Sequence, residues 1–150
     1  MTPDVPGGVT AAHLIGTLGM FGVILFVQIV HYPLMAKVGR EDSAAYAKAH
    51  TDRTGFVVAP LMLMELTAAL LIWMDPPASA PALTASAGLL ALAGIWLVTF
   101  MVSVPCHSRL LHGFDEPTHR RLVRSNWIRT VLWGVRVPIA LLLIPKYLSP

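Results

Sequence analysis

The sequence predicts an all-α integral membrane protein, a bundle of four transmembrane helices, and two observations lead to this fold class. First, 55% of the 150 residues are hydrophobic and only 13% are charged, whereas about a quarter of the residues in a typical soluble domain are charged. Second, the hydrophobic residues gather in four long, mostly uncharged stretches, at about residues 9–32, 56–74, 83–104 and 128–144. The length suits one domain, so we expect residues 1–150 to form a single integral membrane domain.

The first stretch, 9–32, is long enough to cross a hydrocarbon core of about 30 Å as a helix, which takes roughly 17–25 residues. A helix is required because backbone N–H and C=O groups in lipid must be satisfied within their own segment. The stretch is too long for the core of a signal peptide, and no Lys or Arg precedes it. Gly16, Gly19 and Gly22 recur at three-residue spacing, which allows a neighbouring helix to approach closely.

The second stretch, 56–74, follows residues 41–54, which are rich in Ala and in charge. This pattern predicts a short interfacial helix running into the span, with Asp42 or Ser43 as its N-terminal cap. The first and third stretches end at Pro33 and Pro105, which should bend or break their helices.

The fourth stretch is the weakest predicted span, because Arg136 interrupts it. Asp115, Glu116 and Pro117 form a helix-start signal, and the helix that follows should run straight into residues 128–144.

Basic residues concentrate in the two long connections, 33–54 and 105–127, and the proline-rich turn 75–81 contains none. Because basic loops stay in the cytoplasm, both connections should face the cytoplasm and both termini should lie outside, in a plasma (inner) membrane. The isoelectric point near 9.4 therefore reflects membrane topology. Lipid and a hydrophobic small molecule are the expected partners, nucleic acid is not expected, and a homo-oligomer is one hypothesis.

An internal repeat is a further hypothesis. A shift of 76 positions superposes several polar residues, pairing His31 with His107, His50 with Asn126, and Arg53 with Arg129. Two tandem helical hairpins, related by a pseudo-two-fold axis along the membrane normal, would produce this pattern.

Two charged residues fall at the same depth in the predicted spans. Glu65 lies about ten residues into the second span, and Arg136 lies in the fourth. An ionisable group at this depth costs several kcal/mol unless it is paired or protonated, so we expect an ion pair between them. The pair either fixes how the helices pack or lines a cavity where it orients a substrate or a proton.

A polar pocket is predicted at the cytoplasmic end of the bundle. In the fourth span, Asn126, Arg129, Trp133 and Arg136 form one stripe, although Trp133 is equally typical of an interfacial anchor. The residues expected to meet at the pocket mouth are His31, His50, Arg53, His107, Asn126 and Arg129, with Glu65 and Arg136 deeper, as at the floor of a funnel. The alternative for each histidine is an interfacial side chain bonded to a loop carbonyl.

The histidines also raise the question of a cofactor. His31, His50 and His107 are candidate ligands for a transition metal, and His31 and His107 are candidates to hold a haem between them. Against a metal, nearby arginines repel cations and no local ligand motif is present. Cys106 is the single cysteine, which excludes an intrachain disulfide and a cysteine zinc cluster.

The segments VPCHSRL (104–110) and RLVRSNWIRT (121–130) resemble the small four-helix membrane proteins of the anthrone oxygenase-like family. The resemblance covers mainly residues 96–136. It implies a membrane-bound oxygenase acting on a hydrophobic, polycyclic molecule, with Asn126 and Arg129 as site residues. The sequence departs from the family pattern at His107, where an asparagine-like residue is expected, and in carrying His31 and Glu65.

The leading functional hypothesis is therefore a membrane-embedded oxidoreductase. Its catalytic residues would be His31 and His107 as acid/base groups or ligands, Glu65 as a buried base and Arg129 as an oxyanion donor, with Arg53, Asn126, Trp133 and Arg136 binding substrate. The alternatives are a proton-coupled transporter that uses Glu65, which would suit an oligomeric exporter, and a structural or accessory subunit.

Overall fold

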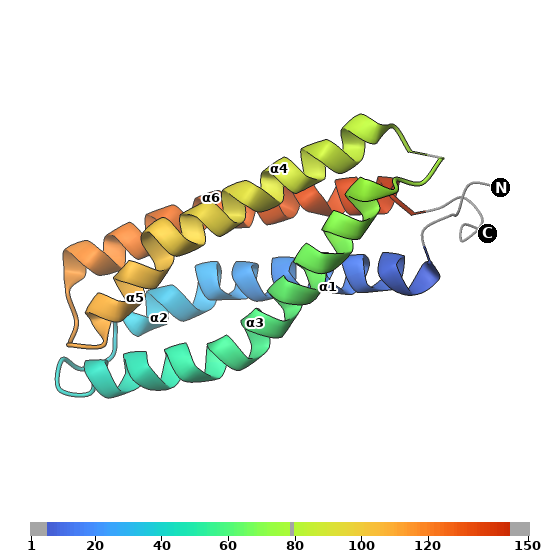
Figure 1. Cartoon of the computed structure of the whole chain (residues 1–150). Helices are drawn as coiled ribbons and strands as arrows, with labels where there is room; N and C mark the ends of the chain where they lie inside the picture. The colour runs from blue at the N-terminus through green and yellow to red at the C-terminus, as the bar shows by residue number, and fades with distance from the viewer. Residues whose placement is uncertain (1–5, 79, 145–150) are drawn as a thin grey trace.

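The computed structural model describes residues 6–78 and 80–144, which form a helical bundle with no strand among them (Figure 1). The two chain ends, 1–5 and 145–150, and with them the predicted location of the termini, lie outside the described residues. The elements in order are α1 (Gly7–Phe26), the π-helical η1 (Val27–His31), α2 (Tyr32–Met35), α3 (Ser43–Met74), α4 (Ala82–Val98), the π-helical η2 (Thr99–Ser103), α5 (Val104–Leu110) and α6 (Glu116–Leu142).

Within the described residues, three helical segments are long and apolar enough to cross a membrane: Gly7–Met35, Ser43–Met74 and Leu83–Leu110. Large apolar side chains point outward from them, among them Phe56, Leu83 and Leu90, which are 74–84% exposed. Large apolar side chains on the outer surface of a bundle are typical of a protein in lipid. The fourth helix, α6, exists as predicted but contains several arginines and does not belong to this group.

The hydrophobic core lies between the helices at mid-length. In Figure 1, α4 and α6 run side by side, α1 lies alongside them and α3 crosses α1 obliquely, in agreement with the packing of α1 on α3, α4 on α6 and α1 on α6. The core contains Met20, Ile24, Met62, Leu92 and Trp133, all nearly or fully buried.

Of the two predicted effects of Pro33 and Pro105, a bend or a break, the break does not occur. Instead, a π-helical segment immediately precedes the short helix that contains each proline. A proline ring clashes with the carbonyl four residues earlier. In both cases this carbonyl, of Ile29 or Met101, belongs to the π-helical segment, whose wider turn relieves the clash and lets the helix continue.

The two π-helical segments begin at residues 27 and 99, which are 72 positions apart. The predicted repeat has a different offset of 76, so His31 lies two residues before its proline and His107 two residues after. The tandem repeat stays a prediction.

The N-terminus of α3 differs from the prediction in one detail, because neither Asp42 nor Ser43 caps it through its side chain. The Oγ of Ser43 donates to the carbonyl of Arg40 at 2.8 Å and accepts from the backbone N–H of Phe114 at 3.1 Å, so it joins the two long connections. The predicted interfacial helix and the second span form one continuous helix. At the start of α6, Asp115 accepts a hydrogen bond from the N–H of Thr118 at 3.1 Å, which confirms the predicted helix start.

Candidate functional site

Three histidines predicted to share a pocket come together at one end of the bundle. His31 comes from η1, His50 from α3 and His107 from α5. The rings of His31 and His50 stack with their centroids 4.1 Å apart, and His50 lies 5.4 Å from His107. Tyr46 also stacks with His31, with the ring centroids 5.8 Å apart. We call His31, His50 and His107 the histidine cluster.

Tyr32 belongs to this site although no pattern in the sequence predicted it. Its side chain is 2% exposed, and its hydroxyl shares a hydrogen bond with Nε2 of His107 at 3.3 Å. His119 of α6 is buried and donates from Nε2 to the backbone carbonyl of Tyr32 at 2.9 Å, which fixes this turn. The sequence feature that could have identified Tyr32 is its position between His31 and Pro33, at the end of a predicted span.

Arg129 is buried at 5% exposure, and no carboxylate among the described residues pairs with it. It donates from one terminal nitrogen to Ser103 Oγ at 3.4 Å and to Asn126 Oδ1 at 3.3 Å. Asn126 in turn donates to Gln28 Oε1 at 2.8 Å, so its side chain is held in place. The Nε of Arg129 is buried without a hydrogen-bond partner. Burying an unpaired charge is costly. A bound anion would neutralise this guanidinium, so Arg129 is a candidate anion-binding residue.

These side chains surround two adjoining cavities. The inner chamber has a volume of about 200 Å³, and its polar lining residues include Tyr32, His50, Ser103, His107 and Arg129. The outer chamber has a volume of about 450 Å³ and is lined by His31, Tyr46, His50, Arg53 and the apolar Phe26 and Val57, among others. Both chambers share Val23, Val27, His50 and Thr54, so His50 lies where they meet.

A second polar cluster lies inside the bundle and centres on Glu65, which is completely buried. Arg136 forms an ion pair with its Oε1 and also donates to the backbone carbonyl of Gly88. Thr17 donates to the same Oε1 at 3.3 Å. His13, which the sequence analysis overlooked, has its Nδ1 3.4 Å from this oxygen, without the geometry of a hydrogen bond. We call these four side chains the buried charge cluster.

Close helix packing holds the buried charge cluster together. A Cβ added at Gly16 would lie 2.6 Å from the Cβ of Glu65, so α1 and α3 touch there, as the small-residue spacing predicted. A Cβ added at Gly19 would make ordinary contact with Leu61, but nothing lies within 4 Å of a Cβ added at Gly22. The third glycine therefore does not serve this contact, because its side of α1 faces open space.

The two clusters do not form the single funnel that the sequence predicted. Glu65, Asn126, Trp133 and Arg136 line neither chamber. His50 and Glu65 are 15 positions apart on α3, or roughly 22 Å along a helix, and the hydrophobic core fills the space between the clusters. Trp133 belongs to that core and is fully buried, with Arg136 over its ring at 5.7 Å, so the interpretation of Trp133 as an interfacial anchor is wrong.

The histidine cluster does not resemble a metal centre. Among the described residues no group of three or more His, Cys, Asp or Glu side chains is arranged to hold a metal ion. The rings of His31 and His50 are nearly parallel, at 19°, so they face each other instead of pointing their nitrogens at one point. The ring of His50 contacts both His31 and His107, which leaves no slot for a porphyrin between those two histidines.

Comparison with models of protein families, with curated proteins and with solved structures gave no match for this chain. Chemically, the site combines imidazoles that can exchange a proton, a tyrosine hydroxyl and a buried cation around a small cavity. Such a set can remove a proton from a bound molecule and stabilise the negative oxygen that results.

Proposed function

We propose that this protein is a membrane-embedded oxidoreductase of the oxygenase type, acting on a small hydrophobic molecule bound in the inner and outer chambers. The observation that carries the proposal is Arg129, a buried guanidinium that borders the inner chamber and has no carboxylate partner among the described residues. A substrate with an anionic or enolate oxygen would neutralise this charge. The resemblance to the anthrone oxygenase-like family supports the same assignment, because it carries over Asn126 and Arg129 as site residues.

The sizes of the chambers support a substrate with one polar end. Ligand pockets usually measure about 300–1,000 Å³, and the inner chamber, at about 200 Å³, is smaller. The outer chamber, at about 450 Å³, has apolar walls that include Phe26 and Val57. A substrate oxygen would therefore enter the inner chamber while a ring system fills the outer one.

The proposed reaction begins with a proton transfer. His107 or His50 removes a proton from a CH₂ group next to a carbonyl, and Arg129 holds the enolate oxygen that forms. Tyr32 orients His107 through their shared hydrogen bond. Dioxygen, the co-substrate, then oxidises this carbon, so that CH₂ and O₂ become C=O and H₂O. Glu65 takes no part in this scheme, because it lines neither chamber.

The test is oxygen consumption by the purified protein in detergent with an anthrone as substrate. Arg129→Gln should lower kcat/KM by about 10²–10³-fold, the effect of removing one oxyanion donor. Arg40→Gln is the matched control, because this arginine is exposed and lies outside both chambers. Equal activity in Arg129→Gln and the wild type would overturn the proposal.

A proton-coupled transporter is the second candidate, and the buried charge cluster is the observation that favours it. Oε2 of Glu65 and both ring nitrogens of His13 are buried without hydrogen-bond partners, so either group offers a place for a proton. In this case Glu65→Gln would abolish substrate-driven proton release in vesicles while Arg129→Gln would not. If neither variant changed binding, turnover or proton release, a structural or accessory subunit would remain.

We also propose that α6 completes a four-span topology, with both termini outside the plasma membrane and both basic connections in the cytoplasm. The arginine that interrupts the predicted span, Arg136, is 1% exposed and paired with Glu65, so it does not face lipid. Reporter domains fused to each terminus test this topology. An alkaline phosphatase reporter should be active at both ends, and an inactive fusion at either end would contradict it.

A further inference from the structure

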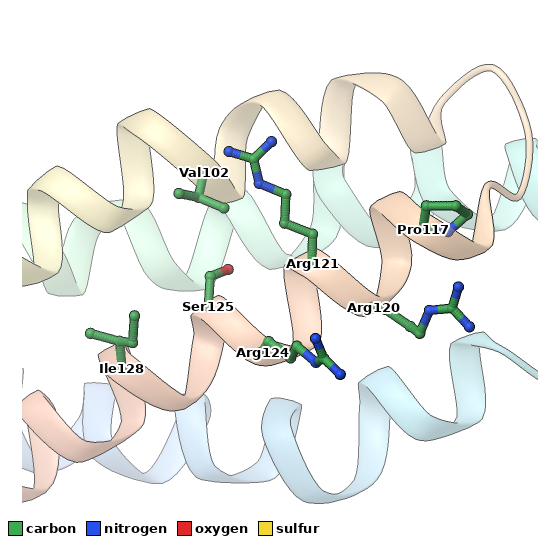
Figure 2. Close-up of a pocket in the computed structure, with 7 residues that line it drawn as sticks. All are labelled: Val102, Pro117, Arg120, Arg121, Arg124, Ser125 and Ile128. Carbon is green, nitrogen blue, oxygen red and sulfur yellow. The ribbon is translucent and has the colours of Figure 1, made fainter.

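A basic groove lies on the outside of the bundle, away from both chambers. It runs between η2 and α6, has a volume of about 490 Å³, and is lined by Arg120, Arg121 and Arg124 together with Val102, Ser125 and Ile128 (Figure 2). Figure 2 shows Arg121 extending from α6 toward Val102 on the neighbouring helix, Arg120 and Arg124 extending to the other side, and Ile128 at the end of the groove away from Pro117. We call this the arginine groove.

The positive charge of the groove is only partly neutralised. Arg120 pairs with Glu116 at 2.6 Å, four residues earlier on the same helix. Arg121 and Arg124 pair with no carboxylate among the described residues. Arg121 and Arg109 both line an adjoining hollow of about 320 Å³, so a fourth arginine lies beside the groove. An anion bound here would contact more than one unpaired arginine.

The surface of α6 changes from charged to apolar where the groove ends. Arg124, Ile128, Val131 and Val135 follow one another at spacings of three or four residues, so they lie on one face of α6. The three apolar residues are 48–58% exposed. From η2, Val102 lines the groove, and its neighbours Phe100 and Met101 are exposed, at 59% and 64%. A soluble anion would gain nothing from this apolar surface. An anionic lipid, by contrast, needs a basic site for its headgroup and an adjoining apolar surface for its acyl chain.

We propose that the arginine groove binds an anionic phospholipid, with its phosphate between Arg121 and Arg124 and an acyl chain along Ile128, Val131 and Val135. Two arguments carry the proposal: the charge complementarity of unpaired guanidiniums and a phosphate, and the apolar stripe that continues from them. The site is distinct from the inner chamber, because the two share no lining residue.

Lipid binding to the full-length protein in a zwitterionic detergent, measured by native mass spectrometry, tests this assignment. The probes are phosphatidylglycerol, phosphatidylcholine of the same chain length, and inorganic phosphate. The wild type should prefer phosphatidylglycerol, and R121Q/R124Q should weaken its binding by roughly 10- to 30-fold, the effect of two basic residues at a membrane surface. The control K37Q/R40Q removes the same charge from exposed residues of the other connection and should change binding less than about twofold.

Three results would overturn the proposal. Equal binding of phosphatidylglycerol and phosphatidylcholine would show that charge does not select the ligand. Equal weakening in R121Q/R124Q and K37Q/R40Q would indicate a general surface potential. Displacement of the lipid by inorganic phosphate at the same concentration would identify a site for a soluble anion.

The acyl chain is tested separately with a phosphatidylglycerol that carries a photoreactive group in its chain. In the wild type, crosslinks should fall on α6 between residues 128 and 135, and R121Q/R124Q should lose them. Crosslinks spread equally over α3 and α6 would contradict a defined lipid site. This readout does not depend on activity, so its failure is distinguishable from failure of the proposed enzyme.

Discussion

The histidine cluster with Arg129 and the buried charge cluster each contain a buried arginine and at least one histidine, but they differ in two respects. In the buried charge cluster, Arg136 is paired with Glu65, and α1 packs at Gly16 directly against the Cα, Cβ and Cγ atoms of Glu65. Around the histidines, Arg129 has no carboxylate partner among the described residues and borders a cavity. The charge of Arg136 is neutralised inside the protein, whereas an unpaired cation beside an open space is suited to an anionic ligand. This difference supports the proposed chemistry at the histidine cluster and favours a structural role for the Glu65–Arg136 pair.

The largest expected effect comes from breaking the buried pair. Arg136→Leu leaves the carboxylate of Glu65 buried without its partner and should destabilise the fold by about 3–5 kcal/mol. The double variant Glu65→Leu/Arg136→Leu should recover most of this loss, because replacing both charges with apolar side chains is often neutral. Unfolding in mixed micelles followed by circular dichroism measures both. Equal stability of Arg136→Leu and the wild type would remove the structural role of the pair.

The next largest loss of stability is expected from overpacking the helix contact at the buried charge cluster. Gly16→Ala places a methyl group 2.6 Å from the Cβ of Glu65, and the two helices must separate. The expected cost is about 1–3 kcal/mol, as for other overpacked sites. Gly22→Ala is the matched control on the same helix, since nothing lies within 4 Å of its added Cβ, and it should not lower stability. The same unfolding assay compares them, and equal effects would contradict the close contact.

Arg129 should behave in the opposite way to Arg136. Because Arg129 is buried without a counterion, Arg129→Met should change the free energy of unfolding by less than about 1 kcal/mol, or raise it. The same variant should lose activity in the oxygen-consumption assay. A loss of stability as large as that of Arg136→Leu would mean that Arg129 is structural too, and the comparison would fail.

The smallest effect concerns acid stability at the start of α6. The hydrogen bond from Thr118 and, to a lesser extent, the positive charge of Arg109 lower the pKa of Asp115 below its ordinary value of 3.8. The folded form thus favours the carboxylate, so its contribution to stability is complete above the unfolded pKa and is lost as the pH falls through the folded pKa. Asp115→Asn can still cap the helix but does not titrate, so its unfolding should lack this acid-side loss. Identical pH profiles of the two proteins would contradict the role of the carboxylate.

The sequence predicted much of the local structure because hydrophobicity and helix-start signals act over short distances. The apolar stretches correctly located three membrane-type helices, and Asp115 with Pro117 located the start of α6. At Pro33 and Pro105 the same local signals were less specific, because they predicted either a bend or a break. A π-helical segment is a small rearrangement of backbone hydrogen bonds with no strong signature in residue type, so the sequence did not show how each helix continues past its proline.

The candidate site was predicted in part. The sequence correctly brought His31, His50 and His107 to one end of the bundle, because each follows from its position relative to a span. It overlooked Tyr32 and His13, whose importance depends on partners far away in the chain, His107 and Glu65. It also placed Glu65 at the floor of the same pocket, where the hydrophobic core in fact intervenes.

By itself, the sequence determined that the chain forms apolar helices and which polar residues lie at which depth along them, because spacing along a helix fixes height at 1.5 Å per residue. Tertiary structure decided the rest, because the rotation of each helix about its axis depends on how all four pack together. That rotation pairs Arg136 with Glu65 against Gly16 and leaves no room around them. It also turns Arg129, seven positions away on the same helix, toward a cavity and three histidines instead of toward a carboxylate.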